Sequence, residues 1–405
     1  MKVNRWTALT LIGISVFFSL SLWFSTSVIE AELKTRWHLT SLMESWLSIA
    51  IPIGFVIGAF VSSFFGLADR YNTRKFFAMS AFTGALLNGM LIFIDQGVLG
   101  ILFRIFIGIT LAGVYPPAVK LISQWFPKRR GVATGILIAA LSLGSSLPHF
   151  ISLFISFLDE RLVLLLCSLL AIIAAILMNY ALSDAPGSAN NKSFSLGMVK
   201  KILHNKPVML ANYGYFGHMW ELYGMWTWLP AFLISSFSSY SPSFDPWVSA
   251  LVTFGSIGVA GGVGCVIGGL ISDKIGRSNL TIIAMTVSGL CAISIGFAFG
   301  HYPWLTIFLA LVWGMFVVAD SAQFSAAVSE FSEVEYAGTA LTFQMCIGYL
   351  ITIGSINLIP LVRDFIGWEW VFTLLSVGPI IGIITMSKFK GYEKGKLHMS
   401  NTLSG

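Results

Sequence analysis

Apolar runs of roughly 20 residues recur along this chain, separated by short polar segments. A helix of about that length spans the hydrocarbon core of a bilayer. Inside lipid the backbone must satisfy its own hydrogen bonds, so only helices and closed barrels can cross. The runs are too long and too uniformly apolar for the alternating strands of a barrel. Only 10% of the residues are charged, against about a quarter in soluble proteins. The sequence therefore predicts an all-α polytopic membrane protein.

Hydropathy and loop signals predict twelve membrane-spanning helices. They are expected near residues 6–29, 42–65, 76–95, 98–121, 131–157, 161–182, 208–235, 248–271, 279–299, 303–325, 337–361 and 368–388. The longest polar stretch divides six predicted helices from six. We therefore expect an N-terminal six-helix bundle at 1–182, a cytoplasmic linker at 183–207, and a C-terminal six-helix bundle with a short cytoplasmic tail at 208–405.

The distribution of lysine and arginine predicts the orientation. With the N-terminus inside, the inside segments hold 19 of the 24 basic residues and the outside loops hold four, while Arg104 lies within a span. This bias follows the positive-inside rule, so both termini are expected in the cytoplasm of a bacterial cell, with the chain in the inner membrane. The net charge of +6 reflects this asymmetry and suits an anionic lipid surface, not nucleic acid. The first apolar run continues to about Ile29, too long for a signal-peptide core, so we expect it to be retained.

The four cysteines lie singly in apolar runs, without the close spacing that a metal site or redox motif needs. We therefore expect no metal and no cofactor. A monomer is expected, with the lipid bilayer, a small-molecule solute and protons as its partners.

Two short charged segments lie 204 residues apart, at residues 66–75 and 269–277, each after the second predicted span of its half. Such a repeat indicates a chain built from two similar halves, an arrangement typical of secondary transporters. In each segment an aspartate lies beside basic residues, and an aspartate at a helix end can pair with an arginine or with exposed amides.

Six plus six helices with this repeated loop resemble the major facilitator superfamily over essentially the whole chain. The family's loop pattern, Gly-x-x-x-Asp-Arg/Lys-x-Gly-Arg/Lys, matches the second segment at Gly269, Asp273, Lys274, Gly276 and Arg277. The first segment has Phe65 and Asn72 at the two glycine positions but keeps Asp69, Arg70, Arg74 and Lys75. The resemblance implies that these loops are gates holding the two halves together in the outward-facing state; the alternative is ordinary cytoplasmic turns. Because asparagine tolerates a left-handed turn, we expect Asn72 to preserve the glycine geometry.

Two further family elements are present in full or in part. Arg104 followed by Gly108 resembles the fourth-helix element. Gly135 and Gly144 have the spacing of the fifth-helix antiporter signature, but Leu147 stands where its Gly-Pro glycine belongs, which weakens a drug/proton antiporter interpretation. The nitrate-transporting branch has an arginine in helices 2 and 8, and the corresponding spans here have none, which argues against nitrate as solute.

Three strongly ionisable side chains, Arg104, Glu221 and Asp320, lie well inside predicted spans 4, 7 and 10. A charge at the bilayer centre costs about 2.5–3.5 kcal/mol on insertion scales, so such residues face water, a partner or a solute. The resemblance implies that helices 1, 4, 7 and 10 line a central cavity. Glu221 shares a helix face with His218 and Trp228 and is predicted to be the main proton-linked group. The alternative is a structural Glu221–His218 pair that fixes helix 7.

The other polar residues in the spans leave alternatives open. Asp320 and Gln323 form either part of the solute and proton pathway or a packing cluster near the inner interface. Arg104 is expected to bind a solute carboxylate, to pair with Glu221, or to bind main-chain carbonyls. Trp23 on helix 1 and Gln344 on helix 11 are further candidates for the cavity wall, although single polar residues also hold membrane helices together.

The function that fits these observations best is secondary active transport of a small polar, anionic organic solute by alternating access, as a proton-coupled symporter. A proton-antiport exporter of a metabolite or drug is the alternative. An enzyme would need a cluster of catalytic groups at one membrane face and a sensor an additional soluble domain, and the sequence offers neither.

Overall fold

The structure, a computed structural model, describes residues 4–126, 130–155, 159, 161–184, 196–333 and 336–403. All regular secondary structure in these residues is helical. The first half contains α1 (Arg5–Leu20), α2 (Glu30–Arg36), α3 (Ser41–Phe64), α4 (Leu67–Arg70), α5 (Thr73–Met90), α6 (Gly97–Leu111), α7 (Tyr115–Trp125), α8 (Arg130–Ile155) and α9 (Arg161–Ile176). The second half contains α10 (Leu196–His204), α11 (Lys206–Tyr240), α12 (Pro246–Thr253), α13 (Gly261–Ile275), α14 (Arg277–Ser294), α15 (Pro303–Ala319), α16 (Ser321–Phe331), α17 (Ala337–Val371) and α18 (Val377–Leu403). Six short 3-10 or π-helical segments connect or extend them, at Ser27–Ile29, Leu91–Phe93, Leu177–Ala181, Phe254–Ala260, Ile295–Ala298 and Phe372–Ser376.

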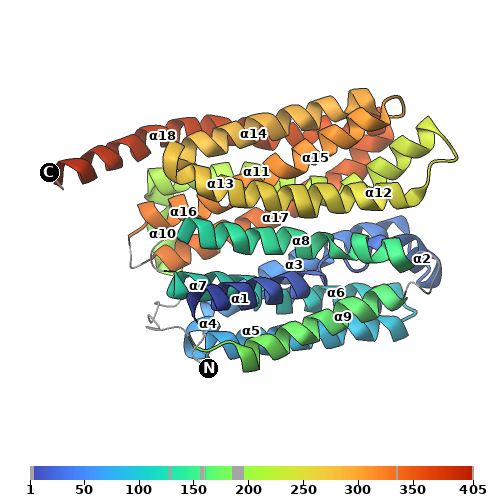
Figure 1. Ribbon diagram of the computed structural model, residues 1–405, viewed down its shortest axis with the longest axis horizontal. Helices are drawn as coiled ribbons and strands as arrows, with labels where there is room; N and C mark the ends of the chain where they lie inside the picture. The colour runs from blue at the N-terminus through green and yellow to red at the C-terminus, as the bar shows by residue number, and fades with distance from the viewer. Residues whose placement is uncertain are drawn as a thin grey trace.

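The two halves lie against each other along their length, with α1 to α9 in the lower part of Figure 1 and α11 to α18 in the upper part. Across the boundary α8 packs on α13 and α3 packs on α17. Within the first half α3 packs on α6 and α5 on α9, and within the second α11 packs on α17 and α18. This all-helical arrangement is the expected fold class.

Nine stretches of the described residues are helical, long and apolar enough to cross a membrane. One of them, Ala337–Lys396, covers the two predicted spans 337–361 and 368–388, with a break at Gly367, whose φ of 76° is left-handed. Two predicted spans are not among these nine stretches. The span 6–29 contains α1, which is shorter than the nine, and the span 208–235 lies within α11, which is more polar. The count of twelve spans remains a prediction.

Three predicted spans are broken where the sequence weakens the helix. The first ends at Leu20 instead of continuing to residue 29, in a segment rich in serine whose hydroxyls bond to nearby carbonyls. The fourth breaks between Leu111 and Tyr115, because the two prolines that follow Tyr115 supply no main-chain N–H and fit only the first turn of a new helix. The tenth breaks at Asp320, between α15 and α16. These breaks bring main-chain groups into the interior.

Two glycines of the family elements allow close helix crossings. A Cβ atom at Gly108 would lie 2.3 Å from the main-chain oxygen of Ile51, so glycine lets α6 approach α3. A Cβ atom at Gly144 would lie 2.3 Å from the oxygen of Phe17, so α8 approaches α1 in the same way. The broken helix α1 and the cavity wall on α8 are therefore held at short range.

Candidate functional site: a central cavity between the halves

A cavity lies between the two halves, in the interior of the molecule. Its wall combines side chains of α7 and α8 from the first half with side chains of α11, α15, α16 and α17 from the second. The lining residues are Tyr115, Ile138, Leu141, Tyr215, His218, Met219, Leu222, Tyr223, Trp226, Val318, Ser321, Ser325, Met345 and Tyr349. Its volume in this conformation is about 40 Å³, so a solute enters only after the wall opens. An apolar, aromatic wall with a few polar groups has the composition of a small-molecule site.

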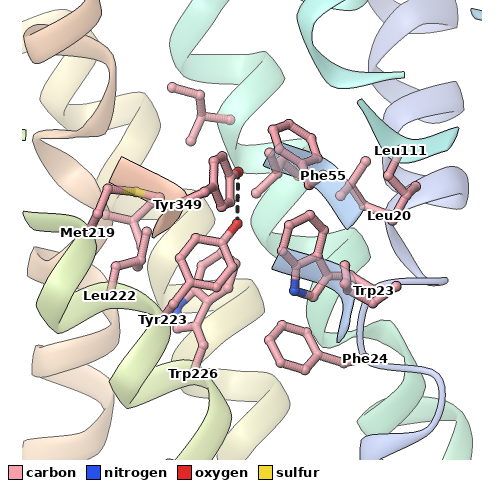
Figure 2. Close-up of a cluster of buried hydrophobic side chains, with 14 of the residues drawn as sticks. Leu20, Trp23, Phe24, Phe55, Leu111, Met219, Leu222, Tyr223, Trp226 and Tyr349 are labelled. Atoms are coloured by element: carbon pink, nitrogen blue, oxygen red, sulfur yellow. Dashed lines mark hydrogen bonds between the residues drawn. The ribbon is translucent and has the colours of Figure 1, made fainter. Parts of the chain in front are cut away.

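An aromatic cluster adjoins this cavity and joins the halves (Figure 2). The ring of Trp23, just beyond the end of α1, lies 5.3 Å from that of Tyr223 and 5.7 Å from that of Tyr349. Phe55 of α3 lies 4.4 Å from Tyr349, and the hydroxyls of Tyr223 and Tyr349 are 3.0 Å apart. The expected candidate Trp23 thus lies beside the cavity wall, on the side of the broken first helix.

His218 and Asp320 form a buried pair at the cavity wall. The Nδ1 atom of His218 lies 2.9 Å from Oδ1 of Asp320, and its Nε2 atom lies 2.9 Å from the Ser321 hydroxyl. His218 comes from the continuous helix α11, whereas Asp320 and Ser321 occupy the break between α15 and α16. The pair can hold one proton in more than one position, because imidazole both donates and accepts.

The alternative of a structural Glu221–His218 pair is wrong, and the predicted proton-linked role of Glu221 stays a prediction. Glu221 accepts hydrogen bonds from Trp313 Nε1 and from the Ser288 hydroxyl, both at 2.8 Å. These donors lie on α15 and α14, so the carboxyl group connects three helices of the second half. Residues three apart on a helix share a face, but their side chains can point toward different neighbouring helices. Here Glu221 contacts α14 and α15, and His218 contacts the junction of α15 and α16.

Arg104 takes the third of its expected roles. Its Nη1 atom donates to the Leu22 oxygen at 2.9 Å and its Nη2 atom to the Trp23 oxygen at 2.6 Å, while Nη1 also contacts the Ser25 hydroxyl at 3.3 Å. Both carbonyls belong to the turn that follows α1, and the Leu22 oxygen also accepts from the Ser25 hydroxyl. The guanidinium therefore stabilises the broken segment that carries Trp23.

The remaining predicted pathway residues have separate positions. Gln344 on α17 accepts a hydrogen bond from Ser325, a cavity residue, at 3.1 Å. The amide oxygen of Gln323 accepts from Arg277 Nη1 at 2.8 Å. Trp228 donates to the main-chain oxygen of Ile356 at 2.9 Å, and it is not among the cavity-lining residues. Only Gln344 of these three is connected to the cavity wall.

One arginine in each repeated loop binds partners in its own half. Arg74 donates to Asp184 at 3.3 Å and to the Leu182 oxygen at 2.7 Å. Arg277 donates to both carboxylate oxygens of Glu330, at 3.1 and 2.5 Å. Arg70 and Lys274 are exposed. The side chains of Asp69 and Asp273 lie outside the described part of the structure, so the gating role of these loops stays a prediction.

The expectation for Asn72 is also wrong. Asn72 has a φ of −57° and caps α5, accepting from the main-chain N–H of Lys75 at 3.1 Å. The left-handed residue of this loop is Gly66, with φ 61°. In the second loop Gly276 is the residue with positive φ, at 88°. The two copies therefore turn at different positions, and the asparagine contributes a helix cap.

Most residues of the site were not predicted, and His218 is the one predicted site residue among the fourteen that line the cavity. Tyr115 lines the cavity because the Pro-Pro break turns α7 inward, and the prolines were the available signal. Trp313 and Ser288, which bind Glu221, lie on apolar helices and carry no motif.

Comparison with known proteins agrees with this architecture. The family model described as Major Facilitator Superfamily matches residues 11–356. The "Niacin transporter NiaP" of Acinetobacter baylyi is 25% identical over 353 residues, which cover 76% of this chain and 75% of that protein. A protein of Bacillus subtilis, named "Putative niacin/nicotinamide transporter NiaP", is 29% identical over 229 residues, 54% of this chain. That match spans only 56% of the Bacillus protein.

A solved structure shows the same fold. The crystal structure of the nucleoside transporter NupG superposes with a TM-score of 0.72 over 94% of this chain and 99% of that chain, at 12% sequence identity. The protein described here belongs to the major facilitator superfamily. It is a multi-pass membrane transport protein and not an enzyme.

Proposed function

We propose that this protein is a secondary active transporter that moves a small aromatic carboxylate together with a proton. The observation that carries the proposal is the His218–Asp320 pair in the wall of an aromatic cavity between the two halves. Aromatic rings on several sides of the cavity favour a planar solute, which can stack between them. The names of the two curated relatives make nicotinate the first solute to test and nicotinamide the second.

Charge balance supports coupling to a proton. Of the described residues that line the cavity, His218 is the one whose side chain can carry positive charge, and it lies against an aspartate. Arg104 is already engaged by carbonyl oxygens. An anionic solute that entered this wall alone would add uncompensated charge in a low-dielectric interior, which is costly. A proton taken up by the His218–Asp320 pair removes that cost.

Other ionisable groups surround this pair. Tyr215 lies one turn from His218 on α11, with ring centroids 6.0 Å apart. Glu221 and Cys265 are close enough to Asp320 to interact with it electrostatically. His218 lies in the cavity wall, whereas Glu221 is not among the lining residues and is bound by Trp313 and Ser288. We therefore propose the His218–Asp320 pair as the proton-carrying group.

The orientation in the proposal follows the charge pattern of the chain. Both termini are cytoplasmic in the bacterial inner membrane, in line with the positive-inside distribution. We also propose a monomer as the working unit. The loops at 66–75 and 269–277 act as cytoplasmic gates during alternating access.

Uptake by proteoliposomes tests the proposal. Labelled nicotinate is expected to accumulate above its external concentration when the lumen is alkaline, and a protonophore should abolish the accumulation. Exchange of labelled for unlabelled nicotinate, which needs no gradient, should persist with and without the protonophore. If neither nicotinate nor nicotinamide enters faster than into protein-free liposomes, the proposed solute class is wrong. Accumulation driven by a gradient of the opposite sign would point to the exporter alternative.

A further inference from the structure

The indole nitrogen of Trp226 is a buried donor that lacks a partner. Trp226 lines the cavity and is 1% exposed. Its Nε1 atom has no acceptor among the described residues. Leaving an N–H group buried without an acceptor is unfavourable, so such a group in a native interior calls for an explanation.

Several other polar groups of the wall are occupied, while the hydroxyls of Tyr115 and Tyr215, which both donate and accept, have no hydrogen-bond partner among the described residues. His218 and Ser321 bind each other, Ser325 donates to Gln344, and Tyr223 bonds to Tyr349. Trp226 itself lies against aromatic rings, with Tyr223 at 5.5 Å and Phe24 at 6.3 Å (Figure 2). Rings surround the donor but supply no acceptor oxygen, so it is available to a molecule that enters the cavity.

Three other tryptophans of the second half donate their indole N–H to an acceptor. Trp220 donates to the Leu374 oxygen at 3.1 Å, Trp228 to the Ile356 oxygen at 2.9 Å, and Trp313 to Glu221 at 2.8 Å. All three anchor one helix to another. Trp226 is on the same helix as Trp220 and Trp228 and differs from them by facing the cavity without such an acceptor.

We infer that Trp226 Nε1 is the fixed donor that selects the solute, by binding an acceptor oxygen or ring nitrogen of a planar solute seated among the rings of the wall. An indole N–H only donates, so it can bind the oxygen of a carboxylate or carboxamide or the nitrogen of a pyridine ring. It forms no hydrogen bond with a solute that lacks an acceptor. This inference rests on the proposed function for the choice of probe, and it specifies which atom of the site recognises the solute. A site built around one unpaired donor rejects analogues that leave it unpaired.

The test compares Trp226→Phe with Trp220→Phe in nicotinate binding by isothermal calorimetry of the full chain in detergent. Phenylalanine keeps an aromatic ring in the wall and removes the N–H. Loss of one hydrogen bond to a charged acceptor is expected to weaken nicotinate binding by about tenfold or more in Trp226→Phe. Trp220→Phe removes an N–H that binds a main-chain oxygen outside the cavity lining, so its affinity should match that of the wild type.

Wild-type affinity in Trp226→Phe would overturn the inference, as would an equal loss in both variants. Absence of nicotinate binding to the wild-type chain is a failure of the proposed function instead, and the comparison is then made with whichever acceptor-bearing solute of a metabolite panel stabilises the wild type. If Trp226→Phe inserts poorly, Trp226→Leu and Trp226→Gln are compared, since only glutamine retains N–H donors. Tighter nicotinate binding by Trp226→Gln than by Trp226→Leu supports the inference, and equal binding by the two variants contradicts it.

Discussion

The Nδ1 atom of His218 and the Oδ1 atom of Asp320 lie 2.9 Å apart, and they connect a continuous helix to a broken one. His218 is fixed on α11, whereas Asp320 occupies the junction of α15 and α16. From this junction α16 extends to Glu330, which binds Arg277 in the second repeated loop. A change of protonation at the pair can therefore alter a helix that contacts both the cavity and the loop.

Replacing Asp320 by asparagine should separate binding from coupling. The amide keeps the shape and a hydrogen-bonding group beside His218 but cannot exchange a proton with it. We expect nicotinate to undergo counterflow in Asp320→Asn proteoliposomes while accumulation driven by a pH gradient is lost. Asp245→Asn, at the exposed cap of α12, is the matched control and should accumulate solute normally. Full pH-driven accumulation by Asp320→Asn would exclude the pair as the proton carrier.

Glu221→Gln should act mainly on stability. The carboxyl group of Glu221 accepts from Trp313 and from Ser288. In the variant the amide oxygen can accept from only one of them, so with Trp313 satisfied the NH₂ group donates to the Ser288 hydroxyl, which must turn to the Met285 oxygen at 3.4 Å. The variant is expected to lose about 1 kcal/mol of unfolding free energy, because a short hydrogen bond to a carboxyl group is replaced by weaker ones. Thermal melting in detergent measures this loss. An unchanged melting temperature combined with lost pH-driven accumulation would return the coupling role to Glu221.

Arg104→Lys should loosen the end of the first helix without changing solute affinity. The guanidinium donates to two successive main-chain oxygens at the break, of Leu22 and Trp23, and a lysine ammonium lacks the planar fork that reaches both. We expect a lower melting temperature and slower transport, because Trp23 is held less firmly against Tyr223. Nicotinate affinity measured by calorimetry should stay close to wild type, since Arg104 does not line the cavity. A large loss of affinity would show that Arg104 binds the solute directly.

The fold class could be predicted from the sequence because the lipid interior restricts long apolar segments to helices. The repeated loop then indicated two similar halves. The particular partners of the buried charges could not be chosen from the sequence. Main-chain carbonyls were one of three possibilities for Arg104, and the oxygens it binds lie outside a helix because α1 ends at Leu20, a break that no single residue encodes. Asp320 was predicted as a candidate from its charge, but its pairing with His218 depends on the direction of two side chains on separate helices.

Glu330→Gln should weaken the connection between α16 and the second loop. Both carboxylate oxygens of Glu330 accept from Arg277, and the loop arginine also binds Gln323 on the same helix. The bond is partly exposed, so the effect on stability should be small. We expect the rate of conformational cycling to change, read as altered solute counterflow at unchanged nicotinate affinity. Glu333→Gln, two residues beyond the end of α16, is the control, and identical kinetics in both variants would contradict a role for the connection.

The short helix α2 should show pH-dependent stability through Glu30. Burial, followed by the charge of Glu44, raises the pKa of Glu30 from 4.5 to about 7, against an opposing effect of Lys34. Between pH 4.5 and about 7 the folded chain therefore holds a proton on Glu30 that the unfolded chain has released. The contribution of protonated Glu30 to the unfolding free energy is complete below the unfolded pKa and is lost as the pH rises through the folded pKa.

Glu30→Gln removes this dependence, because the amide stays neutral at every pH. Compared with wild type, the variant should melt at a higher temperature at pH 8 and at nearly the same temperature at pH 5. Glu32→Gln, on the exposed face of the same helix, is the control and should leave the pH dependence of melting unchanged. Melting curves of Glu30→Gln that run parallel to those of wild type from pH 5 to pH 8 would mean that Glu30 is charged throughout, and that its burial against Glu44 does not control the stability of this segment.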